Sequence, residues 1–390
     1  MTRPVLRTPL CDMLGIEYPV ILAGMGGSGG GPTMAKAELV AAVSNAGGLG
    51  VIGGVAMSVE ELRQEIRKVR DLTDKPFGVD LIFPTWGQVQ GESGGTQLSF
   101  LDVQQFIPEQ TKKFILEVRQ KFNLPDVQPP PAGNPQLFSP DYIRRKVEVV
   151  IEEKVPVFAS GLGSPGPFVP DMHAAGMVVM SLVGNVKNAR RVAEAGVDIV
   201  VAQGYEGGGH TGRVGTMALV PQVVDAVAPK PVVAAGGIGD GRGLAAALCL
   251  GAIGVWVGTA FLVAEESPLD PLFKRRILEA SEEDTRVTRI YSGKTMRNIT
   301  NPLIEEWERA GAPTLPFPFQ MGVVRQITYA AEQAGRKELL MNAAGQIAGM
   351  LRRIRPAREI LEEMVAQAAE ILGRVAPSYT QASLVGKDGP

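Results

Sequence analysis

Eight short runs of β-branched and other apolar residues recur along the first two thirds of the chain, with helical patterns between them. The runs lie at 19–23, 49–53, 76–82, 155–159, 176–181, 197–202, 231–235 and 253–257. Strands that alternate with helices build parallel sheets, and strands that are apolar throughout belong to sheets covered on both faces. The pattern therefore predicts an α/β fold, a parallel (β/α)8 TIM barrel formed by residues 1–265.

A doubly wound open sheet is the rival architecture. Such a sheet usually carries its glycine fingerprint after the first strand, with an acidic residue closing the next strand. The first run here is followed by GMGGSGGG (24–31), which lacks the spacing of that fingerprint, and no acidic residue closes the second run. Because nearly every strand end carries a glycine or a polar residue, we favour the barrel.

Two segments exceed a minimal barrel. Residues 84–140 follow the third predicted strand and contain proline- and glycine-rich stretches around a helical pattern near 108–122. A connection of this length is a candidate lid, oligomer arm or small subdomain. Residues 266–390 form a predicted helical C-terminal extension that packs on the barrel. Its periodic patterns lie at 271–281, 321–334, 337–352 and 356–374, and we expect 291–301 and 312–319 to be irregular.

Bulk composition excludes several classes of function. The 39 basic residues are matched by 41 acidic ones, so the chain has no polycation signature for nucleic acid. We expect no segment to span a bilayer, which takes roughly 20 apolar residues, and the N-terminal residues lack the apolar core of a signal peptide. Two cysteines and two histidines suit neither a disulfide framework nor a metal site. We expect a cytoplasmic protein without metal, membrane or nucleic-acid partners, and the sequence leaves a homo-oligomer open.

The segment VAQGYEGGGHTG (201–212) carries the strongest signal for a site. It presents His210 behind three glycines, directly after an apolar run, and glycine lets a backbone approach a ligand closely. Residues 232–261 then read as strand, glycine turn, helix, strand and glycine turn. Backbone N–H groups at Gly236 and Gly237, next to a helix N-terminus, would offer donors to an anion. This order is typical of the phosphate-binding end of a parallel barrel.

Several motifs occur in a fixed order along the chain. They are PVILAGMGG (19–27), SNAGGLGVIGG (44–54), PFGVDL (76–81), AQGYEGGGHTG (202–212) and GGIGDGRGLAAALCLGAIGVWVGTAF (236–261). The combination resembles the nitronate monooxygenase family, formerly called 2-nitropropane dioxygenases, which are FMN-dependent TIM-barrel oxidoreductases. The resemblance covers roughly residues 8–265 apart from the insertion, and continues weakly into YSGKTMRN (291–298).

The resemblance implies that FMN is the cofactor and implies where it binds. The phosphate would lie at the turns after strands seven and eight, formed by Gly236, Gly237, Gly258 and Thr259. The other cofactor-binding residues would be Gly24, Met25, Asp80, Gln203, Gly208 and Gly209.

Two residues depart from the family pattern. Gly24 stands where the family usually has a proline, and Asp80 stands where it has an asparagine. A carboxylate near the flavin would make an anionic flavin or substrate less favourable. Asp80 is therefore expected to be protonated, turned away or paired with a basic group such as Lys294. The departures bear on the substrate more than on the cofactor.

His210 is the predicted catalytic residue. Imidazole has a pKa near neutrality, which suits removal of a proton from the carbon next to a nitro group. The alternative is a histidine that only bonds backbone in a turn. Glu206 either orients His210 or is solvated. Tyr291, Ser292 and Lys294 either reach the site from the tail or belong to a surface loop.

The expected reaction is FMN-dependent oxidation of an alkyl nitronate, or of a nitroalkane deprotonated by His210, by dioxygen to a carbonyl compound and nitrite. One alternative is an NAD(P)H-dependent flavin reductase acting on a quinone or an enoyl thioester, as enoyl-ACP reductases do. Chemistry like that of the IMP dehydrogenases needs a nucleophilic cysteine near strand six, and neither Cys11 nor Cys249 lies there. A non-catalytic flavin-binding protein would leave turnover unchanged in His210→Ala.

Overall fold

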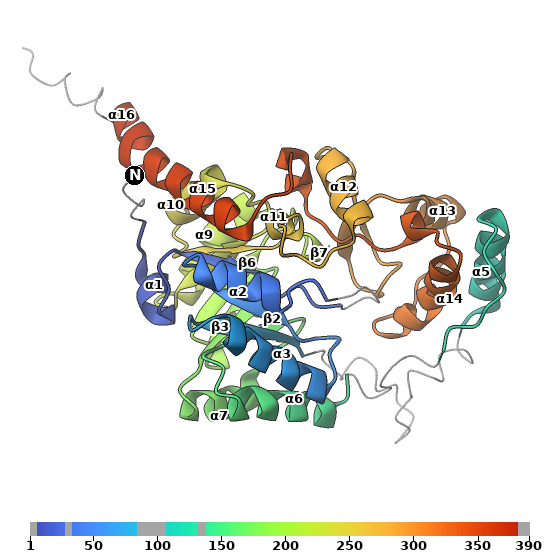
Figure 1. Ribbon diagram of the computed structural model, residues 1–390, viewed down its shortest axis with the longest axis horizontal. Helices are drawn as coiled ribbons and strands as arrows, with labels where there is room; N and C mark the ends of the chain where they lie inside the picture. The colour runs from blue at the N-terminus through green and yellow to red at the C-terminus, as the bar shows by residue number, and fades with distance from the viewer. Residues whose placement is uncertain (1–5, 28–32, 84–106, 131–137, 381–390) are drawn as a thin grey trace, which may run out of the picture.

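Eight parallel strands form a ring surrounded by helices in the computed structural model (Figure 1). The structure describes residues 6–27, 33–83, 107–130 and 138–380. The strand order is β1-β9-β8-β6-β5-β4-β3-β2. A parallel bridge between Ile21 and Leu49 joins β1 to β2, where the Leu22 N–H donates to the Leu49 carbonyl oxygen at 2.8 Å. The sheet therefore closes on itself, and the predicted (β/α)8 barrel is confirmed.

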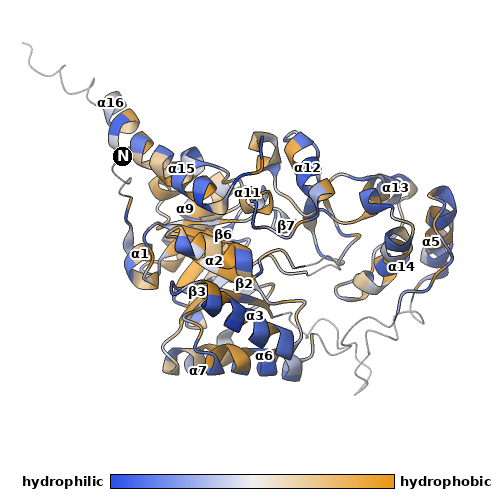
Figure 2. Ribbon diagram, viewed as in Figure 1, coloured by the Kyte–Doolittle hydropathy of each residue, from blue (hydrophilic) through white to orange (hydrophobic). Residues whose placement is uncertain are grey.

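Each predicted barrel strand overlaps one observed strand. The strands are β1 (Val20–Leu22), β2 (Gly50–Gly53), β3 (Phe77–Ile82), β4 (Val157–Gly161), β5 (Val178–Val183), β6 (Ile199–Gln203), β8 (Val232–Ala235) and β9 (Val255–Val257). The helices around them are α2 (Ala37–Asn45), α3 (Val59–Leu72), α6 (Pro140–Glu152), α7 (Val169–Ala174), α8 (Val186–Glu194), α9 (Thr216–Val227), α10 (Gly241–Cys249) and α11 (Thr259–Leu262). In Figure 2 the strands are apolar and the outer faces of the helices are polar, as a doubly covered sheet requires.

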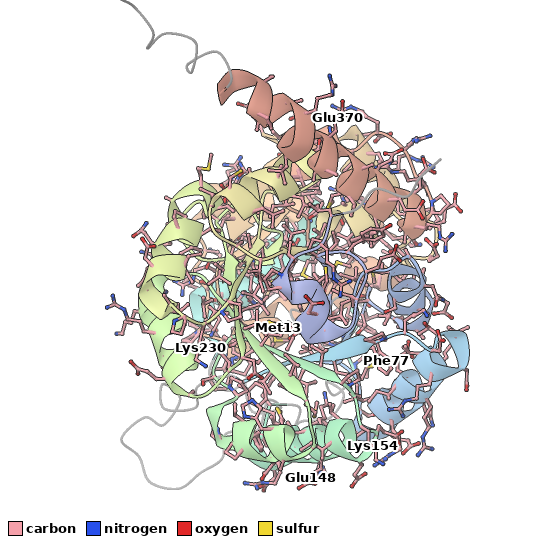
Figure 3. The ribbon with its side chains drawn as sticks, turned by 90° about the vertical axis from the view of Figure 1, so that its left-hand side faces the viewer. Met13, Phe77, Glu148, Lys154, Lys230 and Glu370 are labelled. Atoms are coloured by element: carbon pink, nitrogen blue, oxygen red, sulfur yellow. The ribbon has the colours of Figure 1, made fainter. Side chains whose placement is uncertain are left out.

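The barrel interior is a packed apolar core that is closed at its amino end. Ile21, Met180 and Trp256 lie in this core with the side chains of the short helix α1 (Pro9–Leu14). Figure 3 shows α1, marked by Met13, lying across that end of the ring. A barrel filled in this way has room for a ligand only at the opposite end, where the strands present their carboxyl termini.

A second apolar core joins the insertion to the tail. Helix α5 (Glu109–Lys121) packs on α13 (Pro302–Ala310) and α14 (Phe319–Gln333), to one side of the barrel (Figure 1). The rings of Phe114 and Trp307 meet edge to face, with centroids 4.8 Å apart. Residues 84–106 and 131–137 of the predicted insertion lie outside the described residues. The division into residues 1–265 and 266–390, and a role for the insertion as lid or oligomer arm, stay predictions.

The tail also returns to the carboxyl end of the barrel. Strands β10 (Thr285–Thr288) and β11 (Met296–Ile299) form an antiparallel sheet with β7 (Gly209–His210). The expectation that 291–301 is irregular is therefore wrong for the residues of β11. The strands of this small sheet are too short to leave an alternating pattern in the sequence, and β7 has only two residues.

The remaining tail helices only partly follow the prediction. Helices α12 (Pro271–Glu279) and α15 (Ala357–Glu370) agree with it, and α15 packs on α10, where the Gly241 N–H donates to Gln367 Oε1 at 2.8 Å. The helix expected at 337–352 is wrong. That segment has two short 3₁₀ turns, Lys337–Leu339 and Gln346–Met350, joined by non-helical chain. None of the described helices combines the length and apolar character that crossing a bilayer requires.

A carboxylate between α3 and α6 generates a prediction about stability. Glu153 follows α6 and accepts hydrogen bonds from Arg63, Arg67 and Arg70 of α3, and those from Arg67 and Arg63 lower its pKa. Because the pKa is lower in the folded state, the stabilisation is present above the ordinary value of 4.5 and is lost as the pH falls below it. Glu153→Gln should lower the free energy of unfolding at pH 7 by about 1 kcal/mol. Urea denaturation measures this loss.

The control for this experiment is Glu148→Gln, which removes a carboxylate from the same helix. Glu148 is exposed, and no ion pair is found for it among the described residues. Its free energy of unfolding should stay within about 0.5 kcal/mol of the parent. Equal losses in both variants, or a loss in Glu153→Gln that persists at pH 3, would contradict the role given to Glu153.

Candidate functional site

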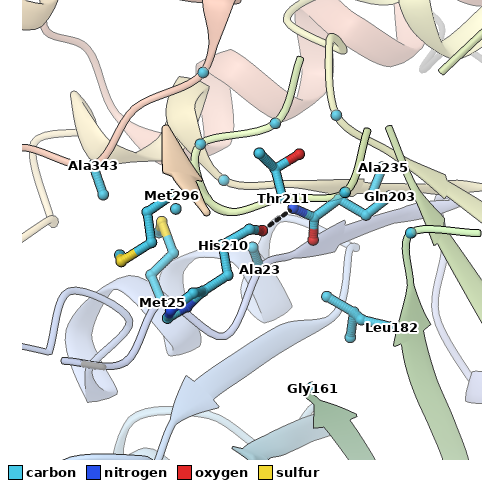
Figure 4. Close-up of a pocket in the computed structure, with 18 of the residues that line it drawn as sticks. Ala23, Met25, Gly161, Leu182, Gln203, His210, Thr211, Ala235, Met296 and Ala343 are labelled. Atoms are coloured by element: carbon cyan, nitrogen blue, oxygen red, sulfur yellow. Dashed lines mark hydrogen bonds between the residues drawn. The ribbon is translucent and has the colours of Figure 1, made fainter. Parts of the chain in front are cut away.

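A cavity of about 670 Å³ opens at the carboxyl ends of the barrel strands. Figure 4 shows residues from several strand ends around it, among them Ala23, Gly161, Leu182 and Ala235. The cavity brings together every site residue predicted from the sequence. These lining residues are Gly24, Met25, Asp80, Gln203, Gly208, Gly209, His210, Gly236, Gly237, Gly258 and Thr259.

The turn after β8 presents free backbone N–H groups to the cavity. Gly236 and Gly237 have φ angles of +86° and +73°, which only glycine adopts readily. A Cβ atom on Gly236 would lie 2.8 Å from the Gly204 carbonyl oxygen. In the described part of the chain, the N–H groups of both glycines lack a hydrogen-bond acceptor. Close by, α11 begins at Thr259 with its own first-turn N–H groups. Free donors at a glycine turn and a helix start can bind a phosphate.

A loop of the tail completes this end of the cavity. The Gly345 N–H donates to Thr259 Oγ1 at 2.9 Å, and the Gln346 N–H donates to the Glu206 carbonyl oxygen at 3.0 Å. The loop lies so close to Gly208 that a Cβ atom there would be 2.6 Å from the Ala344 carbonyl carbon. Sequence reasoning missed this loop, and the only signal for it is the run of small residues in NAAGQ.

Glu206 holds the glycine segment in place. Its carboxylate accepts from the Thr216 N–H at 2.9 Å and from Thr216 Oγ1 at 2.9 Å, at the start of α9. A carboxylate at a helix N-terminus is favoured by the helix dipole and by the free N–H groups there. The expectation that Glu206 orients His210 or is simply solvated is therefore wrong.

His210 is held from both its backbone and its ring. Its backbone pairs with Met296 of β11, and Gln203 Nε2 donates to its carbonyl oxygen at 2.7 Å (Figure 4). Its ring Nε2 lies 2.8 Å from Ser292 Oγ. The imidazole therefore has a partner of its own, and Nδ1 is the ring nitrogen left for a ligand.

The surroundings of His210 keep its ring neutral. Desolvation, followed by the charge of Lys294, lowers the pKa of His210 to about 3. Lys294 and Phe317 lie beside it, with the Lys294 Nζ 5.4 Å from the centre of the Phe317 ring. Desolvation also lowers the pKa of Lys294. At neutral pH the imidazole is a weak base next to a cationic side chain.

The three tail residues named from the sequence do not share one position. Ser292 contacts His210, and Lys294 lines the cavity. Tyr291 does not line it: it is fully buried in the second core, where its hydroxyl accepts from Asn301 Nδ2 at 2.7 Å.

Asp80 lies in the cavity wall without a charged partner. Its side chain is 7% exposed, and Oδ1 has no hydrogen-bond partner. Desolvation raises the pKa of Asp80 to about 8, so the carboxyl is protonated at neutral pH. Of the three expectations for this residue, burial favours protonation, and no ion pair joins it to Lys294 or to another described cation.

The site carries no metal-ligand set that could replace a cofactor. Within the residues that the structure describes, no three His, Cys, Asp or Glu side chains are grouped to hold a metal ion. The donors of the cavity are backbone N–H groups and a few neutral or cationic side chains, which suit an anionic organic ligand.

The sequence is similar to one protein family and to several named proteins. The nitronate monooxygenase family model matches residues 7–367. A Mycobacterium tuberculosis protein whose name describes a monooxygenase is 38% identical over 95% of this chain and 98% of its own. A Staphylococcus haemolyticus protein named as a nitronate monooxygenase is 35% identical over 93% of this chain and 97% of its own.

Solved structures resemble the whole molecule. The nitroalkane oxidase of Streptomyces ansochromogenes is 29% identical with a TM-score of 0.77, covering 94% of this chain and 99% of its own. FabK of Thermotoga maritima is 32% identical with a TM-score of 0.72, covering 96% of this chain and 99% of its own. The likeness extends through the tail that completes the cavity.

The neutral state of His210 can be measured directly because the chain has only one other histidine, His173. We expect the ring nitrogens of His210 to keep the NMR shifts of a neutral imidazole down to about pH 5, well below the ordinary pKa of about 6.5. Spectra of His173→Asn assign the signal. A His210 titration midpoint near 6.5 would show that the cavity does not desolvate the ring.

Proposed function

This chain belongs to the nitronate monooxygenase family, and from that premise we propose that it oxidises alkyl nitronates with dioxygen, using FMN, to a carbonyl compound and nitrite. The chain is an oxidoreductase, and oxidation of nitro compounds is the activity that its family indicates. We choose an anionic nitronate as the substrate because the neutral imidazole of His210 lies beside the cation of Lys294.

The cavity residues fit a flavin mononucleotide. The free N–H groups of Gly236 and Gly237, with the start of α11, would hold its phosphate. Gly24, Met25, Asp80, Gln203, Gly208, Gly209, Gly258 and Thr259 would line the rest of it. When bound, FMN supplies the redox chemistry, by taking electrons from the substrate and passing them to dioxygen.

The basicity of His210 favours a nitronate over a neutral nitroalkane. A nitroalkane must lose a proton from carbon, and a general base works best when its pKa lies near the working pH. The low pKa of His210 makes it a poor base for that step. A nitronate has already lost this proton. His210 can then contact and orient the nitronate through Nδ1 and the ring, while Ser292 holds Nε2 in place.

Charge supports the same choice. Lys294 is a cation on the cavity wall without a carboxylate partner among the described residues. Two carboxyl groups also line the cavity: Asp80, whose pKa is raised by desolvation, and Glu206, whose carboxylate is hydrogen-bonded to Thr216. An anionic substrate meets the attractive charge of Lys294, in surroundings where such a charge acts strongly.

The decisive experiment is anaerobic reduction of the FMN-loaded protein in a stopped-flow spectrometer. We expect a preformed alkyl nitronate to bleach the flavin at least about a hundredfold faster than the neutral nitroalkane, because His210 contributes little general-base catalysis. With oxygen present, nitrite should form in step with turnover. Faster bleaching by NADH or NADPH than by nitronate would instead favour the flavin reductase, and no bleaching by any donor would favour a non-catalytic flavin protein.

Lys294→Met tests the attraction for the anion. The variant keeps the length of the side chain and removes its charge, so kcat/KM for nitronate should fall about tenfold, mainly through KM. Lys187→Met removes an exposed charge from α8, outside the cavity lining, and should leave kcat/KM unchanged. An unchanged KM for nitronate in Lys294→Met would show that the charge of Lys294 does not attract the substrate.

Gly236→Ala tests the phosphate turn. A methyl group at this position needs an unfavourable φ angle and contacts the Gly204 carbonyl oxygen, so FMN should bind at least about tenfold more weakly. The matched control is Gly373→Ala, where a Cβ atom would meet nothing within 4 Å. Equilibrium dialysis with FMN gives both dissociation constants, and equal values would speak against the turn as the phosphate site.

A further inference from the structure

We propose that Asp80 recognises the bound flavin as a neutral carboxylic acid, donating its proton in a hydrogen bond, and that Gly24 leaves the space for this acid. The proposal rests on FMN as the ligand of the cavity. It adds a consequence for regulation: ionisation of Asp80 weakens FMN binding, so that the affinity for the cofactor falls in alkaline solution.

The position of Asp80 on β3 directs its side chain toward the ligand. Its neighbours Val79 and Leu81 pack in the layer between the sheet and the helices. Because side chains alternate along a strand, Asp80 faces the opposite side, which is the barrel interior, and it lies in the cavity lining at the carboxyl end of the strand.

The carboxyl of Asp80 lacks what a buried carboxylate needs. Oδ1 has no hydrogen-bond partner, and within the described residues no lysine or arginine forms an ion pair with this side chain. An unpaired carboxylate in this position is unfavourable by several kcal/mol. The neutral acid avoids that cost, and it brings an O–H donor to the wall of a ligand cavity. A ligand with an oxygen or nitrogen acceptor, such as the flavin ring, satisfies this donor.

The charged and titratable groups around Asp80 do not offset its burial. Lys146 of α6 donates to the carbonyl oxygens of Gly54 and Val55, at 3.0 and 2.8 Å. His210 of β7 is neutral, and Lys294 comes from the β10–β11 connection. Glu206 binds Thr216 at the start of α9. Desolvation is the one cause of the raised pKa of Asp80, and none of these groups contributes to it.

Gly24 and Asp80 occupy each other's space. A Cβ atom built on Gly24 would lie 2.3 Å from Asp80 Cβ and 2.8 Å from Asp80 Oδ2. Backbone and side-chain atoms this close leave no room for a residue with a side chain at 24, unless Asp80 moves. The glycine thus lets the carboxyl lie against the turn that follows β1, in the same wall of the cavity.

The test measures FMN affinity as a function of pH in the FMN-free full chain and in Asp80→Asn. The amide keeps the size and a donor but cannot ionise. We expect the dissociation constant for FMN to rise about tenfold in the parent between pH 7 and pH 9.5, once the change measured in Asp80→Asn has been divided out. At the higher pH, Asp80 must regain its proton before FMN binds, and this requirement weakens binding. Dividing by the variant removes the contribution of ionisations of FMN itself.

Infrared spectroscopy supplies a readout that needs neither FMN nor turnover. The difference spectrum between parent and Asp80→Asn should contain the carbonyl stretch of a protonated carboxyl at pH 7, and this band should disappear as the pH rises through about 8. If the variant does not fold, a pH titration of the parent alone shows the same band, because the band disappears as Asp80 ionises.

The possible outcomes distinguish failure of the role given to Asp80 from failure of the proposed cofactor. FMN binding with the same pH dependence in both proteins, or a carboxylate band at pH 7, overturns the role of Asp80 and leaves the proposed cofactor intact. Failure of the parent to bind FMN at any pH overturns the cofactor, and the role of Asp80 with it. A normalised rise of tenfold together with the protonated band supports the proposal.

Discussion

Desolvation at the carboxyl end of the barrel is the constraint on which the chemistry of this cavity depends. It drives His210 toward its neutral form, raises the pKa of Asp80 and lowers that of Lys294. All three side chains are thereby shifted toward their uncharged states, since the wall offers them few compensating charges. The fixed attraction for an anion then comes from backbone N–H groups at Gly236 and Gly237, whose partial charges do not titrate.

The barrel does not make this environment alone. Ser292 and Lys294 come from the tail, and the N–H of Gly345 donates to Thr259 at the start of α11. Phe317 from the same tail contacts His210 and stacks near Phe138, so that water is excluded from one side of the imidazole. The low pKa of His210 is thus a property of the assembled chain and not of the eight strands alone.

Local patterns in the sequence were sufficient for the barrel and for the residues that line its open end. Apolar runs with glycine turns identify strands and their carboxyl ends, and a parallel barrel brings all such ends together. The contacts of Glu206, the pairing of His210 with Met296 and the loop around Gly345 could not be found in this way. Each depends on a partner that is remote in sequence or on a strand of two residues, and neither leaves a periodic signal. Protonation of Asp80 needed the structure as well, because only burial decides among the three states that the sequence allowed.

Gly24 and Asp80 illustrate how structure changes the meaning of a sequence difference. In the sequence they are two separate departures from the pattern of the family, and the aspartate alone suggests a charge that an anionic ligand would avoid. In the structure they touch, and the smaller residue accommodates the other's carboxyl. A neutral acid in that position is a hydrogen-bond donor of nearly the same size as an asparagine, so under our proposal the two departures together keep a donor in the wall at neutral pH and lose it in alkaline solution. The same architecture is found in proteins named as a nitroalkane oxidase and as FabK, so the fold alone does not assign the reaction. We place that choice in the protonation states of a few side chains of this wall.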